Sequence, residues 1–593
     1  MATGLKSLVT IDVGSTQTRA LLFARVEDRF RFVAAASAPT CLRAAHPDPD
    51  MALGGIRALE HLSAITGRPL LDHHGILISP ELSNGVGVDA CLITISAAPP
   101  IRVVLGGVSP EWSLASLRRA AASAYAQVVE ALSVVPLDGQ PQTEEEWLQA
   151  MIAAEPHLVA IAGGMDGGAT RPVQALLETI VLATRLRPEG ERPWLLFAGN
   201  SVVREEAVAL AGRELPLRVL QNVRPRWDVE YIGPVVEAMD QRYVEHAMKS
   251  LPGLPLLQSW ARGDILPTSR ALSHVARYLS LETVDRGTLV VDVGGNHTVI
   301  TAAHGGLLAQ VVRSESGIGQ GIVSLYQRRG YERIARWLPH EIRPEALEAF
   351  VWTKALHPLS IPQTIEEMWV ELAFVREAIV EAWEQLQSLW PEFLRSLRAF
   401  EPILLTGGAF AYHARPGALA MVVLDTLQPV GLTTLLWDPI GVTSGLGALA
   451  TMDAALAIEV VNSRPWIPLA TVLAPVLDGP MALDELLFTV EVHYRGPDGS
   501  EFVYEVEVRG GRLEVIPIPG VGETELRRFR MRRPVDLGWG PRRTPRRIRI
   551  PGGWLGLIVD GRGRPLPLAE DLKARREQIH RWLWDIGALG GGL

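Results

Sequence analysis

Cysteine and apolar runs of membrane length are what the sequence most clearly lacks. Cys41 and Cys91 are the only cysteines in 593 residues, which excludes a disulfide framework and a thiolate metal cluster and favours a reducing, cytoplasmic environment. The N-terminal stretch has no export signal. No uncharged apolar run approaches the roughly 18 residues that a membrane-spanning helix needs, so no membrane contact is expected.

Basic residues are fewer than acidic ones, since the chain has 57 lysines and arginines against 66 aspartates and glutamates and a net charge of −9. This balance argues against a general nucleic-acid binder. The one basic concentration is a cluster of ten arginines between Arg527 and Arg549, where a contact with RNA or DNA is conceivable. The acidic whole favours instead a solvated face or a contact with an acidic protein, so no nucleic-acid partner is expected.

The chain is too long for a single hydrophobic core, and its patterns predict three domains. Residues 1–260 and 261–460 alternate apolar strands with helices, which predicts two α/β domains, the second with a helical insert over residues 334–400. Residues 461–593 alternate apolar and polar positions across glycine turns and end in a helical pattern. They predict a mainly-β C-terminal domain closed by a helix.

The stretch LVTIDVGSTQTRALLF, beginning at Leu8, reads as two apolar strands joined by a loop of small residues. A carboxylate at the end of a buried strand, here Asp12, is costly unless something pairs with it. Gly14 allows a ligand to approach the backbone, while Ser15 and Thr16 offer donors suited to phosphate. By itself the stretch fits either an ordinary hairpin or a phosphate and metal site.

The same plan recurs 280 residues later in TLVVDVGGNHTVITAA, where Asp292 takes the place of Asp12. The loop residues expected to bind phosphate there are Gly294, Gly295 and Asn296. Two related lobes facing one cleft suit a nucleotide whose phosphates are held from both sides. The two aspartates would supply oxygen ligands to a water-rich Mg²⁺, which prefers one or two carboxylates plus phosphate oxygens.

A third element supports this interpretation. PILLTGGAF, from Pro402, ends an apolar strand in Thr406, Gly407 and Gly408, a turn that would let the backbone lie against an adenosine. Three such elements in this order favour an ATP or ADP site over unrelated hairpins. Phosphoryl chemistry at such a site rests on positioning and charge stabilisation.

In these three elements the sequence resembles the actin, sugar kinase and heat-shock chaperone ATPase superfamily. The resemblance implies duplicated actin-like, or ribonuclease H-like, ATPase lobes around a nucleotide cleft. It also implies that Asp12 and Asp292 hold magnesium through water and orient the attacking water, which makes them the catalytic candidates.

Within that superfamily the sequence is most similar to the MutL (GlmL) family, accessory proteins of cobalamin-dependent glutamate (methylaspartate) mutase. The likeness includes AIAGGMDGG at Ala160, FAGNS at Phe197, DPIGVTSGLGALA at Asp438 and GGWLGLIVDGRGRPLPLAED at Gly552. The resemblance implies a nucleotide-dependent reactivase or assembly factor whose partners are mutase subunits, and it allows for a homodimer. The chain lacks the Asp-x-His-x-x-Gly run of cobalamin binders, so it is not expected to be the mutase itself.

One departure from the family pattern concerns turnover. Val299 stands where the second hairpin usually ends in an aspartate, so nucleotide binding is expected to survive better than hydrolysis and any ATPase is expected to be slow. His297 either orients water or phosphate in its place or is an ordinary loop residue. The alternatives to an accessory ATPase are a small-molecule, sugar-type kinase of the same superfamily and a non-hydrolysing scaffold.

The glycine-rich stretch around Asp166, residues 163–168, has two open interpretations. Its four glycines could form a second phosphate-binding nest. They could equally form a turn that contacts a neighbouring element.

Overall fold

The computed structural model describes residues 4–40, 50–136, 142–283, 285–397, 399–412, 415–477, 479, 481–518, 523–540 and 546–589. Cys41 and two arginines of the predicted cluster, Arg542 and Arg543, lie outside the described residues. Within these ranges no helix is both long and apolar enough to cross a membrane.

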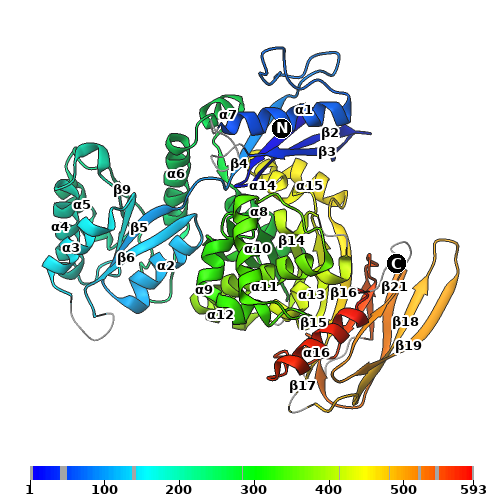
Figure 1. Cartoon of the computed structure of the whole chain (residues 1–593). Coiled ribbons are helices and arrows are strands. Elements are labelled where there is room, and N and C mark those ends of the chain that lie inside the picture. Colours follow the sequence, from blue (N-terminus) through cyan, green and yellow to red (C-terminus); the bar gives the residue numbers. More distant parts are fainter. Residues whose placement is uncertain are drawn as a thin grey trace.

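The first lobe is built on a mixed sheet in the strand order β10-β4-β1-β2-β3, at the top of Figure 1. Its strands are β1 (Ser7–Val13), β2 (Gln17–Val26), β3 (Arg29–Pro39), β4 (Ala90–Ile95) and β10 (Leu266–Pro267), and α1 (Met51–Thr66) and α7 (Leu254–Trp260) lie beside them. Every residue of β1 is buried. The β1–β2 turn closes where the Gly14 N–H donates to the Gln17 carbonyl over 3.0 Å.

The second lobe contains an eight-stranded sheet in the order β13-β12-β11-β14-β15-β16-β24-β20. Its strands are β11 (Gly287–Val293), β12 (His297–His304), β13 (Leu307–Ser314), β14 (Phe400–Thr406), β15 (Gly431–Trp437), β16 (Ile467–Ala474), β20 (Leu513–Ile516) and β24 (Leu557–Asp560). Three of these strands lie beyond residue 460, so the sheet continues into the predicted C-terminal domain. The division of the chain into 1–260, 261–460 and 461–593 stays a prediction.

The predicted duplication is confirmed by the topology of the two sheets. The order β3-β2-β1-β4 of the first recurs as β13-β12-β11-β14 in the second, with the same antiparallel and parallel pairings. The registers also correspond, because Asp12 faces Arg19 and Asp292 faces Val299 across their hairpins. The chain is therefore an α/β protein with two equivalent lobes.

A third sheet is inserted between β4 and β10, at the left of Figure 1. Its five strands are all parallel, in the order β6-β5-β7-β8-β9. They are β5 (Ile101–Gly107), β6 (Ala126–Ser133), β7 (Leu158–Ala162), β8 (Trp194–Phe197) and β9 (Leu217–Val219). The helices of this region are α2 (Ala115–Ala122), α3 (Glu144–Ala154), α4 (Arg171–Arg185), α5 (Arg204–Ala211) and α6 (Gly233–Ser250), with short turns η1 (Pro110–Leu114), η2 (Glu189–Glu191) and η3 (Ser201–Val203).

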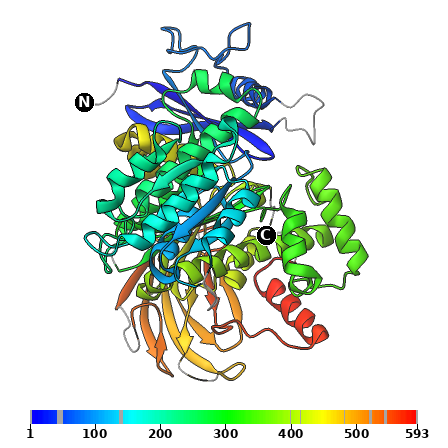
Figure 2. The same ribbon diagram turned by 90° about the vertical axis from the view of Figure 1, so that its left-hand side faces the viewer.

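Two crossing helices connect the lobes, α8 (Thr268–Glu282) and α14 (Val442–Met452). They approach so closely that a Cβ added to Gly447 would lie 2.0 Å from the Ala271 carbonyl oxygen. A contact this tight requires glycine. The other helices of the second lobe are α9 (Ile322–Ala335), α10 (Pro344–Leu356), α11 (Ile365–Leu389), α12 (Pro391–Ser396), η4 (Gly408–Phe410), α13 (Pro416–Thr426) and α15 (Ala454–Asn462). Figure 2 shows α9 to α12 together on one side of this lobe, where a helical insert is predicted.

The C-terminal region is strand-rich and ends in a helix, as its pattern predicts. A four-stranded sheet has the order β19-β18-β21-β23, and β17 pairs with β22. The elements are β17 (Val476–Leu477), β18 (Leu486–Arg495), β19 (Glu501–Arg509), β21 (Glu523–Met531), β22 (Val535–Asp536), β23 (Arg547–Ile550) and α16 (Leu572–Asp585). All are antiparallel pairings, which accounts for the alternating sequence pattern.

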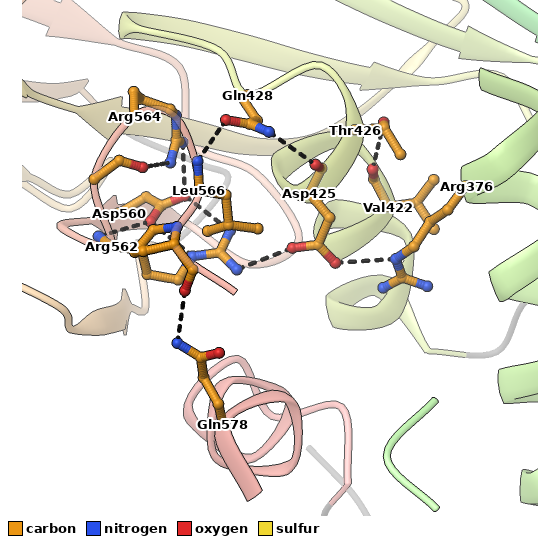
Figure 3. A network of polar contacts seen from close by, with 12 residues as sticks. Arg376, Val422, Asp425, Thr426, Gln428, Asp560, Arg562, Arg564, Leu566 and Gln578 are labelled. Carbon is orange, nitrogen blue, oxygen red and sulfur yellow. Dashed lines mark hydrogen bonds and ion pairs between the residues drawn. The ribbon is translucent and has the colours of Figure 1, made fainter. Parts of the chain in front are cut away.

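A buried charge network joins this region to the second lobe (Figure 3). Asp425 of α13 accepts from Arg376 of α11 and from Arg562, each over 2.9 Å. Arg562 also donates to Asp560 at the end of β24 over 2.9 Å and lies over the Trp582 ring of α16. The Arg562 side chain is completely buried, so its charge depends on these partners for stabilisation.

We predict that Arg562→Met lowers the free energy of unfolding by about 3–5 kcal/mol, because it leaves buried carboxylates without their shared cation. The matched control is Arg512→Met, which removes a pair with Asp484 whose side chains are 50% and 46% exposed and which should therefore cost much less. Urea unfolding measures both. Equal losses for the two variants would contradict a structural role for the buried network.

Candidate site between the two lobes

The three loops singled out in the sequence meet at one place, here called the interlobe cavity. Among the residues that line it are Asp12, Gly14, Ser15, Thr16, Asp292, Gly294, Gly295, Thr406, Gly407 and Gly408. Of the predicted site residues only Asn296 is not part of this lining. Its side-chain nitrogen lies 3.3 Å from Nε2 of His297, which does line the cavity.

Asp12 ends β1 at the floor of the cavity and is 6% exposed. Its Oδ1 accepts hydrogen bonds from the Thr94 hydroxyl over 2.6 Å and from the Thr268 hydroxyl over 3.0 Å. These threonines come from the end of β4 and the first turn of α8. The hydroxyls fix the carboxylate in place and offset part of the cost of burying its charge.

Asp292 occupies the equivalent position in the second lobe, and its environment is less favourable to charge. Burial raises its pKa to about 7, with further contributions from the carboxylates of Asp12 and Asp438 and an opposing effect of Arg19. A Cβ added to Gly407 would lie 2.3 Å from Asp292 Oδ1, so the third loop packs directly against this carboxylate. The two lobes thus bring two acidic groups to one cavity, where a cation would relieve their repulsion.

Arg19 is the positive group of this cavity, and our sequence analysis missed it. Its guanidinium lies 3.9 Å from Asp12 and within 2.9 Å of where a Cβ on Gly441 would be. The signal was present in the pattern, since Arg19 is the cross-strand neighbour of Asp12 in the first hairpin. The corresponding neighbour of Asp292 is the wholly buried, apolar Val299.

The loops of the two lobes touch one another across the cavity. Gln320 donates from its side chain to the Ser15 carbonyl over 3.2 Å, and Gln17 donates to the Tyr412 hydroxyl over 2.6 Å. A Cβ on Gly295 would lie 2.4 Å from the Thr16 methyl group. The cavity measures about 50 Å³, so these contacts leave only a narrow space between the two hairpins.

A larger opening of about 250 Å³, here called the side hollow, continues from the same loops toward the helical insert. It shares Thr16, Gly294, Gly295 and Gly408 with the interlobe cavity. Its far side carries an ion pair of 2.6 Å between Lys354 of α10 and Glu371 of α11, both almost fully buried. No local pattern predicts this pair, because its members lie on separate helices 17 residues apart.

His297 and Tyr125 form the back wall of the cavity. Their ring centroids lie 4.8 Å apart in an edge-on arrangement. Burial lowers the pKa of His297 to about 4, although a hydrogen bond with the Ser96 backbone acts in the opposite direction. His297 is therefore neutral near pH 7, and Tyr125 reaches the site from the inserted sheet.

Asp438, in the segment that follows β15, organises the edge of the site nearest α14. Its carboxylate accepts from the backbone N–H groups of Gly441, Val442 and Thr443, which cap the start of α14. It also accepts from the Thr406 hydroxyl over 3.1 Å. The third loop and the interlobe helix are thereby tied to the same carboxylate.

The glycine-rich stretch at residues 163–168 lies away from this cavity, at the carboxyl edge of the inserted sheet. Asp166 accepts from the Ser201 N–H and from the Asn222 side chain, each over 2.9 Å. Asn200 and Asn222, both buried, donate to the carbonyls of Gly168 and Gly164. Of the two open interpretations, these contacts favour a turn that contacts a neighbouring element. The Asp166 carboxylate already accepts from the Ser201 N–H, a donor that a bound anion would need.

Within the described residues, several arginines of the cluster are paired with acidic residues of their own sheet. Arg527 and Arg547 both contact Glu525, and Arg528 and Arg530 both contact Glu491. This neutralisation agrees with the expectation of a solvated face.

We predict that Asp292→Asn raises the free energy of unfolding of metal-free protein by about 2 kcal/mol near pH 8. The folded-state pKa of about 7 exceeds the usual 3.8, so the stability contributed by the protonated carboxyl is complete below about pH 4 and is lost as the pH rises through 7. The neutral amide removes this loss. Urea unfolding in the presence of a chelator, across this range, measures the difference.

The control for this test is Asp264→Asn, the same chemical change on an exposed loop. An advantage of Asp292→Asn that did not grow between about pH 4 and pH 8 would contradict the raised pKa. Growth of the same size in the control would show that the effect does not belong to the cavity.

Comparisons with known proteins bear on this arrangement. The family model of the MutL protein matches residues 8–464. No curated protein matches the chain. Among solved structures, nucleotide-free acetone carboxylase is 12% identical and covers 85% of this chain and 81% of its own, with a TM-score of 0.34.

Two further solved structures have similar values. The activator of 2-hydroxyisocaproyl-CoA dehydratase from Clostridium difficile, with bound ADPNP, is 10% identical and covers 78% of this chain and 97% of its own, with a TM-score of 0.29. The nucleotide-free diol dehydratase-reactivating factor is 12% identical and covers 78% and 100%, with a TM-score of 0.28. The family match spans most of the chain and all three loops of the interlobe cavity. The chain therefore belongs to the MutL protein family.

Proposed function

We propose that this chain is a magnesium-nucleotide-binding accessory protein for a cobalamin-dependent carbon-skeleton mutase such as glutamate mutase. The observation that carries the proposal is the convergence of two equivalent Asp-Gly hairpins and the Thr406 turn on one interlobe cavity. Membership of the MutL family supports the mutase as partner. The enzyme served, a cytoplasmic location and a homodimer remain predictions.

In this proposal the two hairpins hold the phosphates of ATP or ADP. The loops Gly14–Thr16 and Gly294–Asn296 offer backbone N–H groups and hydroxyls, which suit phosphate oxygens. Arg19 supplies the positive charge, because its guanidinium already lies between the first carboxylate and the Gly441 turn.

The residues of the cavity fit a magnesium ion. Asp12 and Asp292 would hold it, directly or through water, and Mg²⁺ characteristically combines one or two carboxylates with water and phosphate oxygens. The ion would neutralise the phosphate charge and help to align the nucleotide. Its charge would also favour the ionised form of Asp292, whose pKa is about 7 without a metal.

The side hollow is our candidate for the nucleoside. It adjoins Gly294, Gly295 and Gly408, so a nucleotide with its phosphates in the interlobe cavity would extend into this space. Gly407 and Gly408 would let the backbone approach the sugar and base. Lys354 and Glu371 would contact the nucleoside from the helical insert, since both line the hollow.

Hydrolysis is proposed to be slow or absent. Val299 has no acidic or basic group to orient water, and its side chain is completely buried. The neutral ring of His297 is the nearest alternative on the same strand, and it lines the cavity. Losing a positioned base typically costs a factor of about 10²–10⁴ in rate. A non-hydrolysing nucleotide switch is therefore the second candidate.

Nucleotide binding would act on the partner by changing the angle between the lobes. The contacts of Gln320 with Ser15 and of Gln17 with Tyr412 join the two lobes beside a cavity of about 50 Å³, so a change in the angle between the lobes would lengthen or break them. A nucleotide that prefers one arrangement shifts the population toward it. The strand-rich C-terminal region, anchored rigidly to the second lobe, is our candidate for contact with the mutase.

We predict that the chain captures a cobalamin enzyme from a lysate of its native host, with a yield that depends on added Mg-ATP. Arg19→Gln should weaken Mg-ADP and Mg-ATP binding about 10–100-fold, because a charge-assisted contact contributes about 1.5–3 kcal/mol. It should also remove the effect of nucleotide on capture. Calorimetry and mass spectrometry of the captured proteins measure the two results.

Arg25→Gln is the matched control, on the same strand but exposed and outside the cavity. It should bind nucleotide and partner like the unchanged protein. Nucleotide binding without a cobalamin enzyme among the captured proteins would contradict the accessory role but not the nucleotide site. Absence of nucleotide binding would overturn the site.

A further inference from the structure

A second hollow, here called the junction hollow, lies where the inserted sheet meets the second lobe. Its volume is about 500 Å³, and it is separate from the interlobe cavity in its lining residues. One wall comes from α2 and β6, and the other from β13, α9 and α11. A volume of this size is typical of small-molecule sites.

The polar lining of the junction hollow is predominantly basic. Arg118 projects from α2, while Arg313 and Arg328 belong to β13 and α9. The acidic groups near them are Glu315 and Glu381. Three guanidinium groups against two carboxylates leave an excess of one positive charge.

Glu381 is fully engaged and does not neutralise the hollow further. It accepts from Arg328 over 2.7 Å, from Arg313 over 3.0 Å and from the Ser316 hydroxyl over 2.7 Å. Burial acts to raise the pKa of Glu381, but these hydrogen bonds hold it at about 2. The pairs orient the two arginines while leaving Nε of Arg313 unused.

Three buried side-chain atoms in this lining have no hydrogen-bond partner within the described part of the chain. They are Nε of Arg313, the hydroxyl of Ser314 and Oε1 of Gln385. No ion pair is recorded for Arg118 among the same residues. Buried polar atoms are nearly always satisfied, so these three atoms around one hollow call for ordered water or a bound ligand as their partner.

We propose that the junction hollow is a binding site for a small organic anion that carries a carboxylate or phosphate group. Guanidinium groups donate paired hydrogen bonds to carboxylate and to phosphate oxygens. In this hollow, Arg118, Arg313 and Ser314 provide the donors. Gln385 would contact a hydroxyl or amide of the ligand. This site is independent of the proposed nucleotide function.

The position of the hollow gives the anion a structural consequence. The two walls are already joined by the Arg119 side chain, which donates to the Leu389 carbonyl over 2.7 Å, and by the Ser123 hydroxyl, which donates to the Gln310 carbonyl. A ligand held by Arg118 and Arg313 would add a third link between the walls. Ser314 also pairs with His297 in the β12–β13 register, so the site lies one strand behind the second hairpin.

The test uses calorimetry of the full chain with two probes, citrate for carboxylates and inorganic phosphate for phosphates, at constant ionic strength. We expect saturable binding of at least one probe, and the probe that binds identifies the ligand class. Arg118→Leu should weaken it at least tenfold, and Arg171→Leu, which removes an exposed arginine of the same inserted region, should leave it unchanged. Binding of neither probe would overturn the proposal.

A second variant tests whether a loss of binding reflects misfolding and whether phosphate binds at another site. Ser314→Ala removes an unsatisfied hydroxyl, so it should raise the melting temperature of the ligand-free protein and reduce the stabilisation that the bound probe produces. Phosphate binding that persists undiminished in Arg118→Leu would place the ion outside the junction hollow and contradict the junction site. Equal weakening by Arg171→Leu would show only nonspecific charge.

Discussion

The structure depends on the meeting of two carboxylates, Asp12 and Asp292, at one partly closed cavity. Like charges at low dielectric repel, and Arg19 is the cavity's cationic side chain among the described residues. One carboxylate is fixed by two threonine hydroxyls, and burial, with a smaller contribution from the first carboxylate, raises the pKa of the other to about 7. Such a pair costs stability in the free protein, which is typical of sites shaped for a ligand.

The rest of the fold keeps this arrangement in register. Each carboxylate lies one residue before the end of a central strand. The duplicated sheet order therefore places the two carboxylates at the corresponding carboxyl edges of their two sheets. The tight crossing of α8 and α14 at Gly447 brings the two sheets together, and Asp438 ties α14 to the third loop. The buried network around Arg562 then fixes the end of β24 and, through the Trp582 ring, α16 to the helices α11 and α13 of the second lobe.

The fold class and the three loops could be predicted from sequence because they rest on local patterns. Apolar strands ending in Asp-x-Gly recur in the chain, and alternation marks the C-terminal strands. Contacts between distant segments leave no such pattern. The Lys354–Glu371 pair, the place of Tyr125 behind the cavity and the continuation of the second sheet beyond residue 460 depend on tertiary packing. Arg19 had a local signal, since it faces Asp12 across the hairpin, and went unnoticed.

The central claim is that both hairpins hold the same metal-bound nucleotide. The most direct test is a crystal structure with Mn²⁺ and a non-hydrolysable ATP analogue, in which anomalous scattering locates the metal. We expect one strong anomalous peak between the carboxylates of Asp12 and Asp292, with the phosphates against Gly14 and Gly294. A nucleotide bound outside the interlobe cavity, or a metal that contacts only one lobe, would contradict it.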